Sequence, residues 1–324
     1  MSSTLQQPTA IEAKGRADAG EWLARNGVYL AVVVLVVFNL IFTSNFLSAT
    51  NFRTQLLQAA PVVIVALGMA LVIGTEGVDL SVGAVMALAG AMIPLYLGYG
   101  VIAAIAVALL VGLLAGMFNG FLVAYVGVQP IVATLAFLVG GRGLALVITH
   151  GELTDVDNST MDALGGNNVL GVPVTVLVAA VLAVLVGILV QRSTFGRRLV
   201  AVGGNRNASA LAGLPVRKVL FGVYAISGVL AGVAGVLATA RLGASDPTHT
   251  GLLLELSAIT AVVVGGTPLT GGRVRILGTV MGAILMQLVR ATLIKHNLPD
   301  SSTQMVQAVI IIAAVYSARE RSTR

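Results

Sequence analysis

The chain is a succession of long apolar runs separated by short polar stretches. An α-helix needs about 20 predominantly apolar residues to cross the hydrocarbon core of a bilayer, and runs close to that length recur along most of the sequence. Only 10% of the residues are charged and 57% are hydrophobic, whereas about 25% of a soluble domain is charged. Such a chain cannot cover its surface with water-compatible side chains. The sequence therefore predicts an all-α, polytopic membrane protein.

Ten segments are apolar enough to be expected as transmembrane helices. They cover residues 28–43, 55–73, 82–97, 101–126, 131–148, 173–190, 218–240, 255–265, 274–294 and 303–318. An even number of spans places both termini on the same side of the membrane. We therefore expect a single transmembrane domain, 28–318, between polar tails at 1–27 and 319–324, with an interfacial helix around Trp22 in the first tail.

Two glycine-rich interruptions, at 74–83 and 265–273, predict discontinuous helices. The span expected at 255–265 is short and breaks at the second interruption. Similar Gly-x-Val-Met sequences follow both, at 83–86 and 278–281. In transporters, broken helices in each half of the chain are a pointer to the translocation pathway.

The basic residues give the expected orientation in the membrane. Fourteen of the 19 Lys and Arg fall in the two tails, in the stretch 192–218 and at Arg273 and Arg275, all on one face of the ten-span arrangement. Because cytoplasmic segments carry an excess of Lys and Arg, this face is expected to be cytoplasmic, with both termini on it. Residues 149–171 contain four acidic residues and no basic one, which places them on the opposite side.

The longest polar break inside the apolar part of the chain is 192–217, expected as a cytoplasmic loop. Within it, Asn207-Ala208-Ser209-Ala210-Leu211-Ala212 is typical of a short helix, with Asn207 as its N-cap and Gly213 and Pro215 as stop signals. A short helix of this kind could be moved by another protein that binds to it. The alternative is an ordinary basic loop that only sets the topology.

Three charged residues lie in or beside the expected spans. Glu76 and Asp79 could be intramembrane carboxylates of a proton relay or a solute site, or they could cap the helix that follows. The sequence Asp79-Leu80-Ser81 favours a structural capping role for Asp79 and leaves Glu76 open. Arg142, flanked by glycines, is expected to pair with an acid or with carbonyls at a helix end rather than with substrate.

Several uncharged polar residues also lie within or beside spans. In membrane proteins most such residues form hydrogen bonds between helices, and a few line a polar passage. The candidates for the pathway or for substrate contact are, with Glu76, the residues Gln58, Asn119, Gln129, Thr134 and Thr267.

The sequence lacks the patterns of the common catalytic and metal sites. It has no Cys and only three scattered His, no pair of which has the spacing of metal ligands, so no metal site and no catalytic residue are predicted. A phosphate-binding loop needs Gly-Lys followed by Ser or Thr, and none of the three Lys follows a Gly. The net charge of +6 is a matter of membrane topology and does not indicate nucleic-acid binding.

Four groups of motifs together resemble a known family. They are Gly77-Val78-Asp79-Leu80-Ser81-Val82-Gly83; Asn119-Gly120 with Gln129-Pro130, Ala133-Thr134-Leu135 and Arg142-Gly143; Phe195-Gly196-Arg197 through Asn205 to Ala212-Gly213; and Glu255-Leu256 through Gly265-Gly266-Thr267 to Gly271-Gly272. The chain resembles the permease subunits of ribose-type bacterial ABC sugar importers, which are grouped with the branched-chain amino-acid permeases. Gly265, Gly266, Asp79 and Arg142 would be structural members of these motifs. The departures are Ser257, Pro268 and Ile131, and Ser257 removes an acidic residue that is usual in the family.

The resemblance implies a set of partners. Two permeases would form the pathway, ABC ATPase subunits would dock from the cytoplasm and carry ATP and magnesium, and a periplasmic or lipid-anchored binding protein would deliver a monosaccharide. Residues 207–213 would be the coupling helix that contacts the ATPase. The complex would lie among the lipids of the bacterial cytoplasmic (inner) membrane.

Two other functions stay open on the residues alone. An ion-coupled secondary transporter of a small polar solute would use Glu76 and Asp79 as its coupling pair, and a passive channel would need no partner. Neither the identity of the sugar nor the choice between two identical and two different permeases follows from the sequence.

Overall fold

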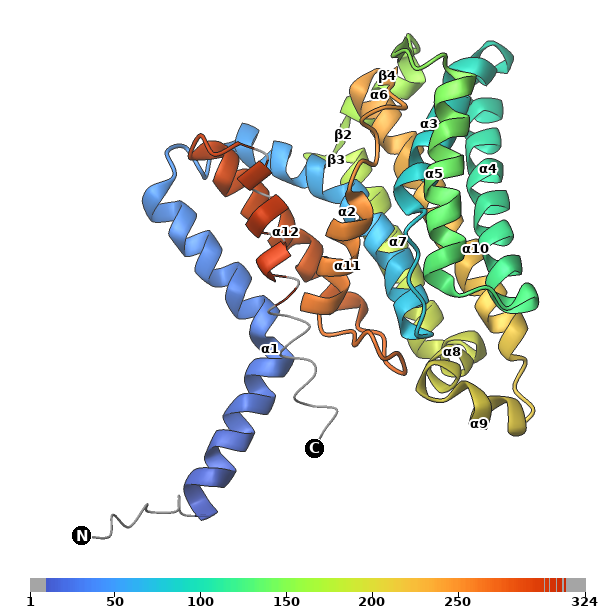
Figure 1. Ribbon diagram of the computed structural model, residues 1–324. Helices are drawn as coiled ribbons and strands as arrows, with labels where there is room; N and C mark the ends of the chain where they lie inside the picture. The colour runs from blue at the N-terminus through green and yellow to red at the C-terminus, as the bar shows by residue number, and fades with distance from the viewer. Residues whose placement is uncertain (1–9, 300, 303, 307, 311, 313–324) are drawn as a thin grey trace.

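The computed structural model describes residues 10–299, 301–302, 304–306, 308–310 and 312, with side chains from residue 26 onward (Figure 1). Its larger elements are α1 (Ala10–Phe42), α2 (Ala49–Gly74), α3 (Val82–Tyr96), α4 (Val101–Phe121), α5 (Pro130–Ile148), α6 (Ser159–Gly166), α7 (Val174–Arg192), α8 (Thr194–Gly204), α9 (Arg206–Leu211), α10 (Val216–Leu242), α11 (Leu254–Val264) and α12 (Ile276–Lys295). A 3₁₀ turn, Leu97–Tyr99, extends α3, and a π-helical turn, Leu122–Val126, extends α4.

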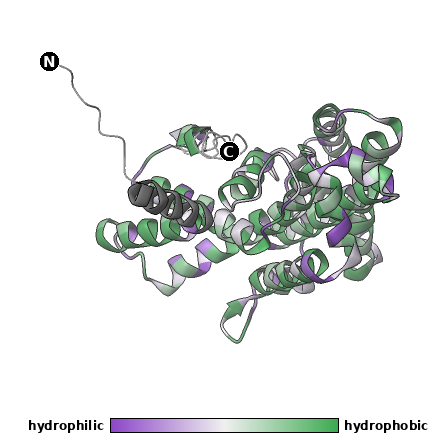
Figure 2. Cartoon of the chain, turned by 90° about the horizontal axis from the view of Figure 1, so that it is seen from below, coloured by the Kyte–Doolittle hydropathy of each residue, from purple (hydrophilic) through white to green (hydrophobic). Residues whose placement is uncertain are grey.

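The described part of the chain is mainly helical and apolar, as expected for a polytopic membrane protein. Seven of its helices are long and apolar enough to cross a membrane, and two shorter apolar helices lie at Asn26–Phe42 and Leu254–Val264. Trp22 lies within α1, which runs without a break from the expected tail into the first expected span. The span expected at 303–318 falls largely outside the described residues. Seen along the bundle from the end that carries α8 and α9, hydrophobic residues predominate on the helices (Figure 2).

Helix α10 is the centre of the larger group of helices and packs against α2, α3 and α4. Its contact with α4 is made by small residues, because a Cβ atom on Gly112 would lie 2.6 Å from the carbonyl oxygen of Gly228. A Cβ atom on Gly116 would collide with the carbonyl oxygen of Tyr224. Small residues spaced four apart let membrane helices approach closely enough for their backbones to touch.

A second group, formed by α1, α11 and α12, lies on the other side of α2 (Figure 1). Polar side chains form hydrogen bonds within this group and between the group and α2. Asn39 Nδ2 donates to Thr292 Oγ1 at 2.7 Å, between α1 and α12, and Gln287 Nε2 donates to Gln58 Oε1 at 2.6 Å, between α12 and α2. These bonds satisfy polar groups in an apolar surrounding, where an unpaired group would be costly.

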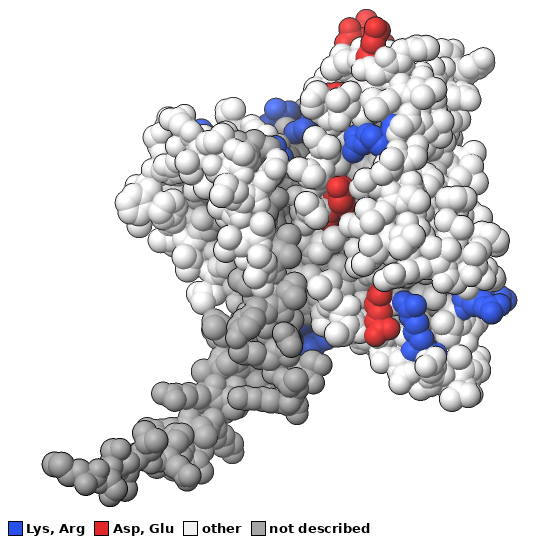
Figure 3. Space-filling model, in the orientation of Figure 1, with Lys and Arg blue, Asp and Glu red and all other residues white. Residues whose placement is uncertain are grey.

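The two ends of the bundle differ in structure and charge. One end carries α8 and α9, and the other carries α6 and two pairs of two-residue strands, β1 (Thr154–Asp155) with β4 (Ala244–Ser245) and β2 (Asn168–Val169) with β3 (Val172–Pro173). The strands are a small departure from the expected all-α class. Figure 3 shows acidic side chains at the strand-bearing tip and basic ones beside α8 and α9. Residues 149–171 and 192–217 therefore lie at opposite ends of the bundle, in agreement with the prediction that they face opposite sides of the membrane.

Two helices begin inside the bundle rather than at its ends. Asp79, just before α3, hydrogen-bonds to Ser227 near the middle of α10, so α3 starts at about half the depth of the bundle. A Cβ atom on Gly83, in the first turn of α3, would collide with the carbonyl oxygen of Gly251. Gly251 lies three residues before the start of α11, so the N-termini of α3 and α11 meet at this depth.

Helix α11 ends at Val264, where the sequence predicted a break, but it also begins inside the bundle, which the sequence did not predict. Helix α11 has 11 residues and rises only about 16 Å at 1.5 Å per residue, too little to cross a bilayer. Before the helix, the non-helical segment 246–253 leads from β4, at the strand-bearing end, into the bundle. The glycine-rich stretch 265–273 follows α11 and lies beside α8, since a Cβ atom on Gly271 would lie 2.7 Å from the carbonyl oxygen of Gly203.

Candidate functional site

The expected short helix is present at the α8–α9 end, with a different N-cap. Helix α9 spans Arg206–Leu211, and Asn205 Oδ1 accepts a hydrogen bond from the backbone N–H of Ala208 at 2.9 Å. The prediction that Asn207 is the cap is wrong, because Asn207 already lies inside the first turn. Gly213 has a φ of 76° and ends the helix as predicted, since this conformation favours glycine.

Helix α9 presents small and apolar residues to the outside. Ser209 is buried, whereas the side chain of Leu211 is 91% exposed. Asn207, Ala208 and Ala210, together with Ala212 and Gly213 beyond the helix, are also exposed. We call residues 207–213 the knuckle. A nearly fully exposed Leu among small residues on a polar end of the molecule is the kind of anchor that protein partners bury.

The knuckle is joined to α2 through the first residue of α9. Arg206 Nη2 donates to the carbonyl oxygen of Thr75 at 2.5 Å, and Arg206 Nε lies 3.7 Å from Glu76 Oε2. The second contact is half-exposed and contributes little free energy, so the bond to the buried Thr75 is the stronger one. Glu76 therefore lies beyond the end of α2, with a φ of 60°, and not inside a span.

Beside Arg206, three segments of backbone meet through glycines. The N–H of Gly272 donates to the carbonyl oxygen of Gly74, at the end of α2, at 3.1 Å. A Cβ atom on Gly203, at the end of α8, would collide with the same oxygen. We call this contact of Gly74, Gly203, Gly271 and Gly272 the glycine junction. Because it contains no flexible side chain, a displacement of α8 must move α2 or the 265–275 segment.

Beyond the glycine junction, Asp79 ties the start of α3 to α10. Asp79 Oδ1 accepts from Ser81 Oγ at 2.6 Å and from Ser81 N at 3.1 Å, and Asp79 Oδ2 accepts from Ser227 Oγ at 2.8 Å. The residue at the N-cap position of α3 is Ser81, so the prediction that Asp79 caps this helix is wrong. Its role in the structure is nevertheless to hold helices together, and no motif in the sequence indicated Ser227 as its partner.

The uncharged pathway candidates are spread over the molecule. Asn119 Nδ2 donates to Ser81 Oγ at 2.8 Å, and Thr134 Oγ1 donates to the carbonyl oxygen of Pro130 at 2.9 Å. Thr267 Oγ1 accepts from the backbone N–H of Arg275 at 3.0 Å. Gln58 bonds to α12 as described above, and Gln129 is exposed at the start of α5. Thr134 Oγ1 also lies 3.3 Å from the carbonyl oxygen of Val78, so the structure brings both Asn119 and Thr134 close to Asp79. It does not gather the six candidates in one passage.

Two glycines of the late motif serve the packing of α11. A Cβ atom on Gly265 would collide with the backbone of Gly278 in α12, and Gly266 has a φ of 89°. These positions need glycine for close approach and for a left-handed backbone, in agreement with their expected structural role.

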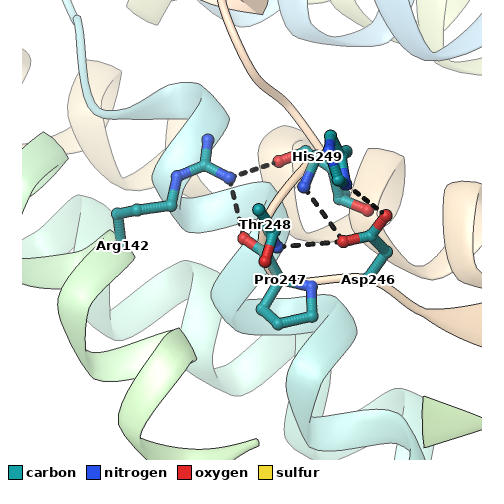
Figure 4. Close-up of polar contacts among 6 residues, drawn as sticks. Arg142, Asp246, Pro247, Thr248 and His249 are labelled. Carbon is teal, nitrogen blue, oxygen red and sulfur yellow. Dashed lines mark hydrogen bonds and ion pairs between the residues drawn. The ribbon is translucent and has the colours of Figure 1, made fainter. Parts of the chain in front are cut away.

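Arg142 holds the segment that leads into α11 (Figure 4). Its Nη1 donates to the carbonyl oxygen of Pro247 at 3.0 Å and to that of Thr250 at 2.7 Å. The sequence correctly predicted carbonyl partners but placed them at a helix end, whereas they belong to the non-helical segment 246–253. We call this contact the arginine clasp.

The clasped segment is itself stiffened by Asp246. Asp246 Oδ1 accepts from the backbone N–H groups of Thr248 and His249, both at 3.0 Å, and Asp246 Oδ2 lies 2.9 Å from His249 Nδ1. Burial alone would raise the pKa of Asp246, but the hydrogen bonds from His249 and Thr248 outweigh it and lower the pKa. The carboxylate is therefore charged at neutral pH and keeps the turn in its shape.

Comparison with known proteins adds to this geometry. Residues 51–315 match the model of a family described as the permease component of the branched-chain amino acid transport system. The chain is 40% identical to a fructose import permease of Bifidobacterium longum, over 87% of this chain and 84% of that protein. It is 38% identical to a galactofuranose transporter permease of Escherichia coli (82% and 78% covered) and 36% identical to a ribose import permease of Haemophilus influenzae (91% and 93%). No solved structure matches.

Proposed function

The chain belongs to the family of permease components of the branched-chain amino acid transport system, and from this premise we propose that it is the transmembrane subunit of an ATP-driven importer of a monosaccharide. The similar proteins are named as permeases for fructose, galactofuranose and ribose, which supports a sugar as the solute. Like them, the chain is a transport component and not an enzyme.

The observation that carries the coupling role is the link from the knuckle to the transmembrane helices. The exposed side chain of Leu211 can be buried by a partner protein. Arg206 connects α9 to Thr75, just after α2, and the glycine junction connects α8 to α2 and to the 265–275 segment. A plain topological loop would not need contacts of this kind. The partner is an ABC ATPase, which binds ATP and magnesium. The sequence of this chain lacks the pattern of a phosphate-binding loop.

The orientation follows from the charges. The α8–α9 end carries the basic stretch and faces the cytoplasm, and the strand-bearing end carries the acidic residues and faces outward. With ten spans, both termini are cytoplasmic. A periplasmic or lipid-anchored sugar-binding protein delivers its sugar to the outer end, and a second permease, identical or different, completes the pathway in the bacterial cytoplasmic membrane.

The proposed mechanism is a population shift driven by the ATPase. ATP binds best to the closed ATPase pair, so it favours the permease conformation that fits the closed pair. A movement of the knuckle passes through the glycine junction to residues 75–81, and from Asp79 to α10. The broken helices α3 and α11 can change their mutual position more readily than continuous helices, because each begins inside the bundle, where Gly83 of α3 lies against Gly251 and Glu255.

An ion-coupled transporter is less well supported by the geometry. The carboxylate of Asp79 accepts three hydrogen bonds, and Glu76 lies at the surface beside Arg206. A coupling ion would have to break the first set of bonds or bind outside the membrane-spanning part.

The test is uptake into proteoliposomes. The permease is reconstituted with the ATPase and binding protein encoded beside it, and uptake of labelled fructose, ribose or galactose is measured with and without internal ATP. We expect uptake of a sugar only with ATP and both partners. Accumulation by the permease alone under a proton or sodium gradient would overturn the proposal.

A further inference from the structure

The carboxylate of Glu255 is a charged group whose burial the packing of the bundle does not explain. Glu255 lies in the first turn of α11, and the residue is only 8% exposed. In the described part of the chain, its Oε2 is buried and has no hydrogen-bond partner. Burial of a carboxylate oxygen without a partner costs several kcal/mol, so an oxygen left in this state is a candidate for a function.

The free oxygen points to the meeting point of the two broken helices. Glu255 Oε2 lies 2.7 Å from the position that a Cβ atom on Gly83 would take. Gly83 belongs to the first turn of α3, where the backbone N–H groups have no partners within the helix. Glu255, the N-terminus of α3 and the N-terminus of α11 therefore share one location in the interior of the bundle.

Arg142 completes the group. Its guanidinium is within electrostatic reach of Glu255 and of Asp246, yet its Nη1 is occupied by the carbonyl oxygens of Pro247 and Thr250. These two acceptors belong to the segment 246–253, which also brings Gly251 against Gly83. In this structure the segment thus covers Glu255 and supplies Arg142 with oxygen acceptors.

The charges of the group select a class of ligand. A guanidinium and a helix N-terminus repel a cation, and a carboxylate repels an anion. A neutral molecule with several hydroxyl groups can bind to both kinds of group. Its hydroxyls can donate a hydrogen bond to Glu255 and accept one from Arg142 or from the N–H groups of α3. Hydrogen bonds to charged groups are stronger than those between neutral groups, so such a ligand can be held without aromatic side chains.

The structure assigns to Glu255 and Arg142 a sugar-hydroxyl-binding site inside the permease, which the segment 246–253 occupies with its own carbonyl groups when no sugar is present. Withdrawal of this segment opens the site and releases the donors of Arg142 for the sugar. The inference rests on the proposed function. It adds the residues that contact the sugar during its passage through the permease.

The experiment uses the complete transporter, with its ATPase and binding protein, in proteoliposomes. Sugar imported per ATP hydrolysed is measured for fructose and for ribose in Glu255→Gln, Glu255→Asp and Arg142→Lys. The matched controls are Glu152→Gln and Arg53→Lys, which make the same changes at exposed residues. The wild type must first import one of these sugars with ATP, and its failure to do so would count against the proposed function instead.

We expect Glu255→Gln and Arg142→Lys to lower the sugar imported per ATP at least about tenfold, while ATP hydrolysis stimulated by the binding protein stays within about twofold. Glu255→Asp keeps the negative charge but shortens the side chain by one methylene group, so the carboxylate lies farther from the bound sugar. We expect this variant to change the ratio of fructose import to ribose import about fivefold. A purely structural role would lower hydrolysis and import together. Such a parallel loss of hydrolysis and import would overturn the inference. So would variants that assemble and import the same amount of sugar per ATP, in the same ratio of fructose to ribose, as the wild type. If Glu255→Gln does not assemble, the result for Glu255→Asp is used to test Glu255.

Discussion

The glycine junction and the arginine clasp both hold a non-helical segment against a helix, but they do so by different means. At the glycine junction, backbone lies on backbone and Gly74 accepts a hydrogen bond from Gly272. At the arginine clasp, one side chain holds two carbonyl groups. A backbone contact can only move as a unit, whereas a side chain can release one acceptor and bind another. In the proposed mechanism, the glycine junction therefore transmits movement at the knuckle end, and the arginine clasp is the contact inside the bundle that can be released.

The strongest test of this comparison is a side chain in the glycine junction. Gly203→Val would place a Cβ atom against the carbonyl oxygen of Gly74, and rigid backbone cannot yield. We expect import to fall at least about a hundredfold, with reduced assembly of the transporter, measured by uptake and by co-purification of the ATPase. The control is Gly204→Val, because a Cβ atom on Gly204 meets nothing within 4 Å. Equal activity of the two variants would show that the junction transmits nothing.

A charge on the knuckle should have the next largest effect. Leu211→Glu replaces the exposed anchor, and burial of its carboxylate against the ATPase would be costly. We expect ATPase association to weaken at least about thirtyfold without loss of the folded permease, measured by titration of the ATPase onto permease in nanodiscs. Ala208→Arg should act in the same direction.

The matched control for this change is Leu170→Glu, at a residue that is 99% exposed at the opposite end. If both Leu→Glu variants bind the ATPase like the wild type, residues 207–213 are not the docking helix.

The link between the knuckle and α2 should be weaker than either contact. Arg206→Gln removes the donor to Thr75 and the half-exposed pair with Glu76, a loss of about 1–3 kcal/mol. We expect the ATPase still to bind, but import per ATP to fall about three- to tenfold. Arg198→Gln, at an exposed position of α8, is the control. Glu76→Gln should change import by no more than about twofold, and a complete loss there would favour the ion-coupled alternative.

The smallest effect is expected at the turn beyond the arginine clasp. The pKa of Asp246 is lowered by its hydrogen bonds, so its contribution to stability is present above the unfolded pKa and is lost as the pH falls through the folded value. The wild type should therefore unfold at a higher temperature than Asp246→Asn at pH 7, with a difference that begins to shrink near the ordinary Asp pKa of about 3.8 and vanishes only once the pH has fallen through the lower folded pKa. A difference in Tm that does not change with pH would contradict this account of the turn.

Part of the fold and of the candidate site could be predicted from properties of short stretches of sequence, namely their hydropathy, charge and residue composition. Hydropathy and the placement of Lys and Arg predicted the membrane class and the opposite positions of 149–171 and 192–217. The small residues of 207–213 and the stop at Gly213 predicted a short helix at nearly the right place. Such features depend on windows of neighbouring residues, which the sequence displays directly.

The remaining features depend on contacts between distant segments. Asp79 looks like a cap until Ser227, in α10, is seen to be its partner, and Glu255 looks like an ordinary first-turn acid until its free oxygen is found beside Gly83. The entry of segment 246–253 into the bundle was also hidden, because the stretch between the spans expected at 218–240 and 255–265 has the composition of an ordinary external loop. Only the tertiary structure could decide these points, since the approach of two backbones is a property of neither segment alone.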